Sequence, residues 1–344
     1  MLKSIKKEIK MRNSYLNDDK VSSIYFGGGT PSVLNKEEIT SLINTIYDNF
    51  KIDTDAEITL ECNPDDLDKK KLIELKEVGI SRLSIGIQSF DDKYLKLMNR
   101  SHNAKEAFSC IQTAKEVGFE NISIDLIYGL PNQSNRNWEE NLAKMLNLDI
   151  QHFSAYSLTV ENKTKLKYQI DNKIIKPLDD KITVKHFNTL IEKASKNNFV
   201  HYEISNFAKE GFFSKHNTAY WENRHYLGVG PSAHSFNGNS RQWNIASNKK
   251  YIEKVNSDDS YFESEKLSNT QKYNEYIFTA LRTIWGVELE YINHQFGKKK
   301  LNYFKKQVIN WENKGNVHVQ NGKYTLTKSG KLYADAIASD LFIV

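Results

Sequence analysis

The fold is decided by the stretch SIYFGGGTP, residues 23–31, in which a short apolar strand runs directly into three glycines. Glycines permit a tight turn, and they let backbone amides and carbonyls approach a ligand with no Cβ in the way. Ligands of parallel α/β sheets bind at the carboxyl ends of the strands. On its own the stretch predicts either a ligand-binding turn or a plain connection from strand to helix.

Short apolar runs and helical patterns alternate along the first half of the chain. The runs predict strands at Ser23–Phe26, Glu57–Glu61, Arg82–Ile87, Asn121–Ile127 and His152–Leu158. Helical periodicity predicts helices at Leu2–Tyr15, Lys36–Phe50, Asp68–Val78, Ala104–Val117 and Trp138–Leu146. This alternation is typical of a parallel sheet covered by helices, so we predict an α/β fold. The chain opens on a helix that should follow a strand, and we therefore expect the first strand of the repeat to be missing.

The alternation stops after residue 159, and three segments are predicted. Residues 1–165 form the β/α repeat, 166–266 a ligand-associated segment, and 267–344 a small helical domain. The second begins with a polar connection near Val160–Asp180, which includes Pro177, followed by a helix over 181–197. The third combines three helical patterns with an Asn-Gly hairpin turn and resembles a winged helix. Since no Arg/Lys-rich recognition helix stands out, we expect no nucleic-acid partner.

Composition excludes several protein classes. The 344 residues are 39% hydrophobic and 26% charged with a net charge of +5, which rules out disorder and low complexity. No stretch reaches the roughly 18 apolar residues of a membrane span, and the polar N-terminus lacks the apolar core of a secretory signal. We therefore expect a cytoplasmic protein with no transmembrane segment.

Polar side chains lie at the ends of consecutive predicted strands. Glu61 ends the second strand, Gln88 ends the third, and Asp125 lies within the fourth. Burying an acid or an amide is costly unless it has a partner. Together with the glycine turn, these residues favour a polar, amine-bearing small-molecule ligand.

Four ordered motifs carry a family resemblance: GGGTP at 27–31, ECNP at 61–64, IGIQSF at 85–90 and DLIYGLP at 125–131. They resemble the oxygen-independent coproporphyrinogen III oxidase family of radical S-adenosylmethionine (SAM) proteins, and the resemblance covers nearly the whole chain. It implies a partial (β/α)6 radical-SAM barrel missing its first strand, a role in porphyrin metabolism and a SAM site. The residues that match the SAM contacts of the family are Gly28, Gly29, Thr30, Glu61, Gln88, Arg100 and Asp125.

The cysteines depart from the family pattern. The resemblance implies a Cys-x3-Cys-x2-Cys motif that ligates a [4Fe–4S] cluster, and such clusters require thiolates. This chain contains only Cys62 and Cys110, which we interpret as buried small apolar residues. As written, it supplies no metal site for the cluster and no catalytic residue for reductive SAM cleavage. We expect either a start assigned at an internal Met or a truncated gene.

A second motif distinguishes branches of the family. His216 and Tyr220 lie at i and i+4 in HNTAYW, residues 216–221, and would share one face of a helix. The motif resembles the haem-binding motif of HemW-type haem chaperones, as does YLGVGPSAHS at 226–235. The resemblance implies haem contacts by His216, Asn217 and Tyr220, with Asn217 orienting the histidine.

Three functions remain open from the sequence. The favoured one is a chaperone that binds haem and SAM and delivers haem to unidentified apo-haem proteins. The others are an anaerobic coproporphyrinogen III oxidase-like enzyme and a remnant that binds neither ligand well. Whether the chain is an enzyme, and whether it forms a homodimer, is left open.

Overall fold

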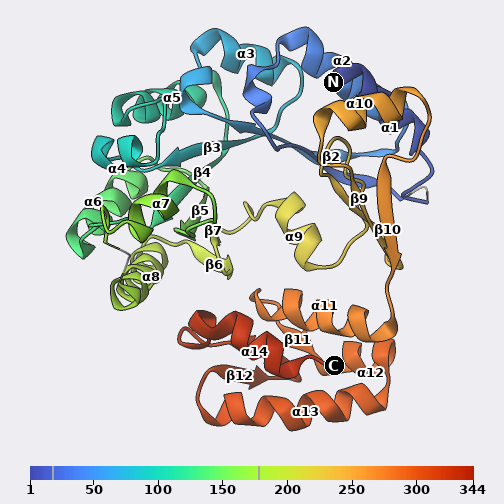
Figure 1. Cartoon of the computed structure of the whole chain (residues 1–344). Coiled ribbons are helices and arrows are strands. Elements are labelled where there is room, and N and C mark those ends of the chain that lie inside the picture. Colours follow the sequence, from blue (N-terminus) through green and yellow to red (C-terminus); the bar gives the residue numbers. More distant parts are fainter. Residues whose placement is uncertain (18, 177–178) are drawn as a thin grey trace. The chain divides into compact units, whose positions relative to one another are not determined.

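The computed structural model describes residues 1–17, 19–176 and 179–344 (Figure 1). The chain forms two compact units that interleave along the sequence. The first comprises Met1–Ser23, Glu37–Ala56 and Ser214–Val344, and the second comprises Ile24–Lys36 and Glu57–Phe213. The three segments predicted from the sequence (1–165, 166–266 and 267–344) follow one another along the chain, whereas these two units interleave.

A seven-stranded sheet has the strand order β1-β2-β3-β4-β5-β7-β6. Its strands are β1 (Val21–Phe26), β2 (Ile52–Cys62), β3 (Arg82–Gln88), β4 (Asn121–Tyr128), β5 (His152–Ser157), β6 (Val200–Glu203) and β7 (Asn206–Ala208). Strands β2 to β5 pair in parallel, while β7 pairs antiparallel with both β5 and β6. The five predicted strands are confirmed, and the antiparallel pair is an addition that the sequence patterns did not predict.

Helices follow the strands of the second unit in the predicted alternation. They are α3 (Lys69–Glu77), α4 (Asp92–Leu97), α5 (Ala104–Val117), α6 (Asn135–Leu146), α7 (Lys165–Asp171) and α8 (Asp180–Lys196), with α2 (Lys36–Tyr47) shared between the units. The core includes Ile124 on β4, Leu142 on α6 and Phe153 on β5, all with no exposed surface. Helix α7 lies inside the connection predicted to be irregular, and Pro177 of that connection lies outside the described residues.

The first unit joins the N-terminal helix to the segment that follows α9 (Lys215–Trp221). Helix α1 (Leu2–Met11) carries Glu8, whose buried carboxylate accepts hydrogen bonds from Gly230 N at 2.9 Å and Asn244 Nδ2 at 2.8 Å. The Tyr251 hydroxyl, on α10 (Asn248–Asn256), donates a third. A small antiparallel sheet completes this region: β8 (His234–Phe236), β9 (Ser240–Asn244) and β10 (Phe262–Lys266).

The C-terminal part of this unit has the element order of a winged helix, as predicted. Its elements are α11 (Asn269–Leu281), β11 (Val287–Glu288), α12 (Leu289–Phe296), α13 (Lys298–Asn313), β12 (Val317–Gln320), β13 (Lys323–Leu326) and α14 (Ala334–Leu341) (Figure 1). The hairpin turns at Asn321 and Gly322, where φ is 50° and 76°, because an Asn-Gly pair tolerates two left-handed residues. Among the residues that the structure describes, no helix combines the length and apolar character needed to cross a membrane.

Candidate functional site

The glycine turn after β1 is built around the Glu61 carboxylate. Gly28 N donates to Glu61 Oε2 at 3.1 Å, and the Tyr25 hydroxyl donates to Oε1 at 2.7 Å. Gly28 and Gly29 have φ of 73° and 72°, and a Cβ on either would meet open space. A Cβ on Gly27 would lie 2.6 Å from the Tyr25 ring. The turn therefore needs glycine at Gly28 and Gly29 for their positive φ and at Gly27 for the close approach of Tyr25. The open space beside Gly28 and Gly29 is available to a ligand.

Thr30 follows the glycine turn and precedes a short 3-10 helix, Pro31–Val33. Its carbonyl accepts a hydrogen bond from Val33 N at 3.2 Å. Thr30 thus lies at the strand end where the sequence placed it, while its contact with SAM stays a prediction.

Arg100 joins the ends of β2 and β3. Its Nη2 donates to Asn63 Oδ1 at 2.8 Å and to the Gly86 carbonyl at 3.1 Å. Gln88 adopts a φ of 63°, which is unusual for a residue with a Cβ, and a Cβ on Gly86 would lie 3.0 Å from Gln88 Nε2. Arg100 and Gln88 therefore meet at Gly86, whose missing side chain makes room for both.

His102 supports the same strand end and was not predicted from the sequence. Its buried ring lies with Nε2 3.1 Å from the Ile87 carbonyl, next to the strained Gln88. The neighbouring Ser101 hydroxyl donates to Asp65 Oδ2 at 2.7 Å. Its position two residues after Arg100, a residue predicted to contact SAM, is the feature of the sequence that could have identified it.

Asp125 is the acid whose ionisation is most altered at this site. Burial raises its pKa to about 6, against smaller lowering effects of Ser154 and Arg82, and the nearby Glu61 carboxylate makes the smallest contribution, which also raises it. A carboxyl group with a pKa this high, close to a second acid, favours a cationic ligand that would compensate both charges. The structure thus groups Glu61 with Asp125, and separately Gln88 with Arg100, within one unit.

The two cysteines do not fit an iron–sulfur cluster. Cys62 and Cys110 are both buried, and burial raises the pKa of each thiol, to about 12 for Cys110. Across the described part of the chain, no three His, Cys, Asp or Glu side chains gather as metal ligands would. The interpretation of both cysteines as buried apolar residues is consistent with this environment.

Anaerobic reconstitution of this chain with iron and sulfide is expected to yield no stoichiometric four-iron cluster. Two buried thiols with raised pKa values supply neither the number nor the ionisation state of ligands that a cluster requires. Iron content and visible absorbance measure the outcome, and Cys62→Ser is the matched variant. A four-iron cluster that disappears in Cys62→Ser would contradict the structural role of Cys62.

The predicted haem motif forms a helix, α9, and its two ring side chains meet on one face. The His216 and Tyr220 rings are 4.9 Å apart and perpendicular at 89°, and Tyr220 contacts Tyr226 with ring centroids 4.5 Å apart. Burial raises the pKa of Tyr220 to about 12, so its hydroxyl stays protonated at neutral pH.

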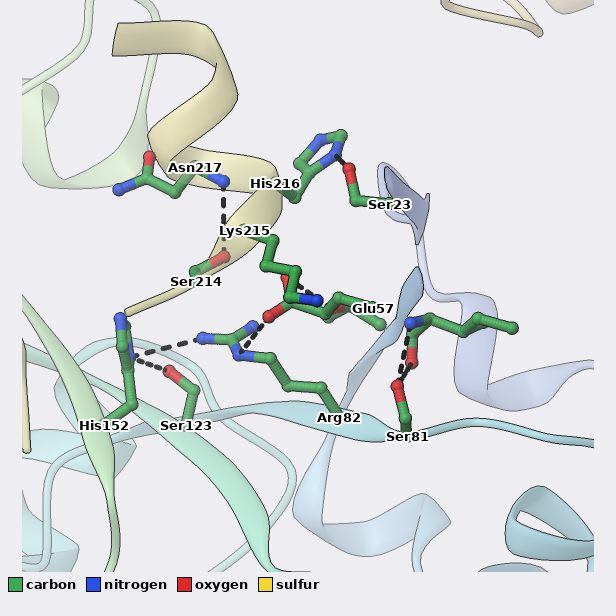
Figure 2. A network of polar contacts seen from close by, with 12 residues as sticks. Ser23, Glu57, Ser81, Arg82, Ser123, His152, Ser214, Lys215, His216 and Asn217 are labelled. Atoms are coloured by element: carbon green, nitrogen blue, oxygen red, sulfur yellow. Dashed lines mark hydrogen bonds and ion pairs between the residues drawn. The ribbon is translucent and has the colours of Figure 1, made fainter. Parts of the chain in front are cut away.

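Ser23 contacts His216, which the sequence motifs did not predict. Its Oγ lies 3.1 Å from His216 Nδ1, although 193 residues separate the two along the chain. In Figure 2 the Asn217 side chain extends away from the His216 ring, and Asn217 N donates to Ser214 Oγ at 3.2 Å. The orienting role expected for Asn217 stays a prediction.

A second polar network lies in the interior of the other unit (Figure 2). His152 Nδ1 lies 2.7 Å from Ser123 Oγ and 3.3 Å from Arg82 Nη2, and Arg82 Nε lies 3.9 Å from Glu57 Oε2. Burial and the Arg82 charge lower the pKa of His152, which keeps its ring neutral. These groups are buried, have polar partners and lie away from the carboxyl ends of the strands, which favours a structural role.

The chain is similar to known proteins of one superfamily and of a named branch within it. The sequence profile of the Radical SAM superfamily matches residues 4–145. Haem chaperone HemW of Bacillus subtilis is 34% identical over 319 residues, which cover 92% of this chain and 84% of that protein. Haem chaperone HemW of Lactococcus lactis is 33% identical, over 81% of this chain and 73% of that protein.

A solved structure confirms the predicted fold. The coproporphyrinogen III oxidase HemN from Escherichia coli, described as a radical SAM enzyme, matches with a TM-score of 0.86. The match covers 99% of this chain and 82% of that one at 23% sequence identity, and it shows an α/β radical-SAM fold with the C-terminal domain included. Taken with the sequence relatives, these findings establish that the chain belongs to the HemW family of the radical SAM superfamily.

Proposed function

We propose that this protein is a chaperone that binds haem and SAM and transfers haem to apo-haem proteins. The observation that carries the proposal is the His216–Tyr220 pair, held with perpendicular rings on α9. Histidine is the commonest protein ligand of haem iron, and tyrosine also serves as one. Two relatives that match 92% and 81% of this chain bear the name haem chaperone, which supports the same function.

The oxidase alternative has weaker support. Its relation to this chain is a likeness of fold at 23% identity, whereas the chaperones reach 34%. The two buried cysteines also do not fit the cluster that radical chemistry would need. We therefore derive no radical step for this chain.

The second unit suits SAM. Glu61 and Asp125 would balance its ammonium and sulfonium charges, Arg100 its carboxylate, and the open glycine turn at Gly28 its polar atoms. When bound, SAM supplies an electrophilic sulfonium centre. Two free cysteines without a disulfide suit a reducing compartment, and we place the activity in the cytoplasm.

Titration of the purified chain with haem tests the proposal. We expect saturable binding of one haem per chain, with a shifted Soret band, followed by transfer of the haem to apomyoglobin. Serum albumin in place of this chain controls for passive exchange of loosely held haem. A titration without saturation, or transfer no faster than from albumin, would contradict the chaperone function.

A further inference from the structure

We propose that Ser23 is a positioning residue for His216: its hydroxyl oxygen accepts the Nδ1 proton, directs Nε2 to the haem iron and, being neutral, keeps the haem transferable. This inference rests on the haem-binding function proposed above and adds a residue and a mode of regulation to it. Ser23 lies on β1, outside every motif that the sequence analysis associated with haem.

Two contacts fix the His216 ring. Ser23 Oγ lies 3.1 Å from Nδ1 (Figure 2). The Tyr220 ring packs perpendicular to the imidazole, with ring centroids 4.9 Å apart. The hydrogen bond fixes one ring atom, and the aromatic contact limits rotation of the ring plane. Together, the hydrogen bond and the aromatic contact restrict the orientation of this half-buried ring.

The helix that carries His216 is anchored next to the same strand. Lys215 Nζ donates to the Asp55 carbonyl at 2.7 Å and pairs with Asp55 Oδ2 at 2.6 Å. Asp55 belongs to β2, and Val21 N of β1 donates to the Lys51 carbonyl just before β2. Ser214 caps the helix by accepting from Asn217 N. The Lys215 side chain thus ties the start of α9 to β2, in addition to the contact of His216 with Ser23 on β1.

Proton placement explains why the partner must be an acceptor. A neutral imidazole carries one N–H, and iron binds the nitrogen that lacks it. Ligation through Nε2 therefore places the proton on Nδ1, where Ser23 Oγ accepts it. Such partners of ligating histidines orient the ring and tune its basicity.

The neutral hydroxyl has a consequence for haem release. A carboxylate partner would pull the Nδ1 proton more strongly, make Nε2 more basic and stabilise ferric iron. A neutral serine hydroxyl attracts the Nδ1 proton less strongly and raises the basicity of Nε2 less. The iron–histidine bond therefore stays weaker and exchanges more readily. A protein that hands haem to clients requires such an exchangeable bond.

Variants at Ser23 test both parts of the inference. Ser23→Ala is expected to lower haem affinity by roughly tenfold, the lower range for lost partners of metal ligands, and Ser23→Thr to restore it. Ser23→Asp is expected to lower the haem reduction potential and slow transfer to apomyoglobin. Ser22→Ala is the matched control, because it makes the same change one residue away, on the opposite face of β1.

A double-mutant cycle separates positioning from general damage. Combined with His216→Ala, the Ser23→Ala change is expected to cause no further loss of affinity. A persisting loss, or a Ser23→Asp variant with unchanged potential and transfer rate, would overturn the role of Ser23. If His216→Ala itself leaves haem binding unchanged, the proposed function fails instead, so the two failures are distinguishable.

Discussion

His216→Ala is expected to weaken haem binding by roughly ten- to hundredfold and to shift the Soret band, because it removes the proposed axial ligand. The loss of one such contact corresponds to roughly 1–3 kcal/mol. Burial of the apolar haem plate is not affected by the substitution, so residual binding should remain. Haem titrations of the variant and the wild type, followed by absorbance, measure both effects.

Two further variants make this result specific. His225→Ala removes another histidine of the same unit, one that contacts Asp19 at 3.2 Å, and it should leave haem affinity unchanged. Tyr220→Phe keeps the ring that packs on His216 but removes its hydroxyl, so it tests whether that oxygen contributes. If His216→Ala leaves affinity and Soret position unchanged, the oxidase-like function becomes the better interpretation.

Local signals explain how much of the fold was predictable. Helix α5 was predicted with both ends correct, because an Asn103–Glu106 capping box begins it and Gly118, with φ of 93°, ends it. Helix α6 begins three residues earlier than predicted, since Ser134 and Asn137 form a capping box ahead of the apolar periodicity. Strands β6 and β7 were missed because four- and three-residue strands leave little pattern to detect.

The site was predictable only in part, and for a physical reason. Motifs identify residues at strand ends, which is how Glu61, Gln88 and Asp125 were found. They do not reveal partners brought in by tertiary folding, such as Ser23 beside His216 or His102 beside Ile87. Serine on a strand has no distinguishing pattern, and its role depends on the residue that it meets.

Asp125→Asn is expected to stabilise the protein near pH 7.5 and to remove a pH dependence of the wild type. Burial raises the pKa of Asp125 to about 6, above its value in the unfolded chain, so the folded state holds the proton more tightly. This contribution to stability is fully present below about pH 4 and is lost as the pH rises through about 6. Asparagine stays neutral throughout and keeps a polar group beside Ser154.

Urea unfolding at several pH values measures the effect. Between about pH 4.5 and 7.5, the variant should gain roughly 2 kcal/mol of unfolding free energy relative to the wild type. Asp149→Asn is the control, because the pH dependence at Asp149 has the opposite sign. Lys209 lowers the pKa of this exposed acid, so the small contribution of Asp149 to stability is lost as the pH falls. Parallel pH profiles for wild type and Asp125→Asn would contradict a raised pKa.

The same proton links stability to ligand binding. A cationic ligand such as SAM favours the carboxylate form of Asp125, so binding must release the proton wherever the free protein still holds it. SAM affinity of the wild type should therefore rise as the pH increases towards about 6, by up to roughly tenfold per pH unit, and then level off. Asp125→Asn should bind SAM more weakly with no such rise. As the pH rises, ionisation of buried Asp125 would thus lower the stability of the free protein and raise its affinity for a cationic ligand. Such a trade between stability and binding is expected of an acid at a binding site.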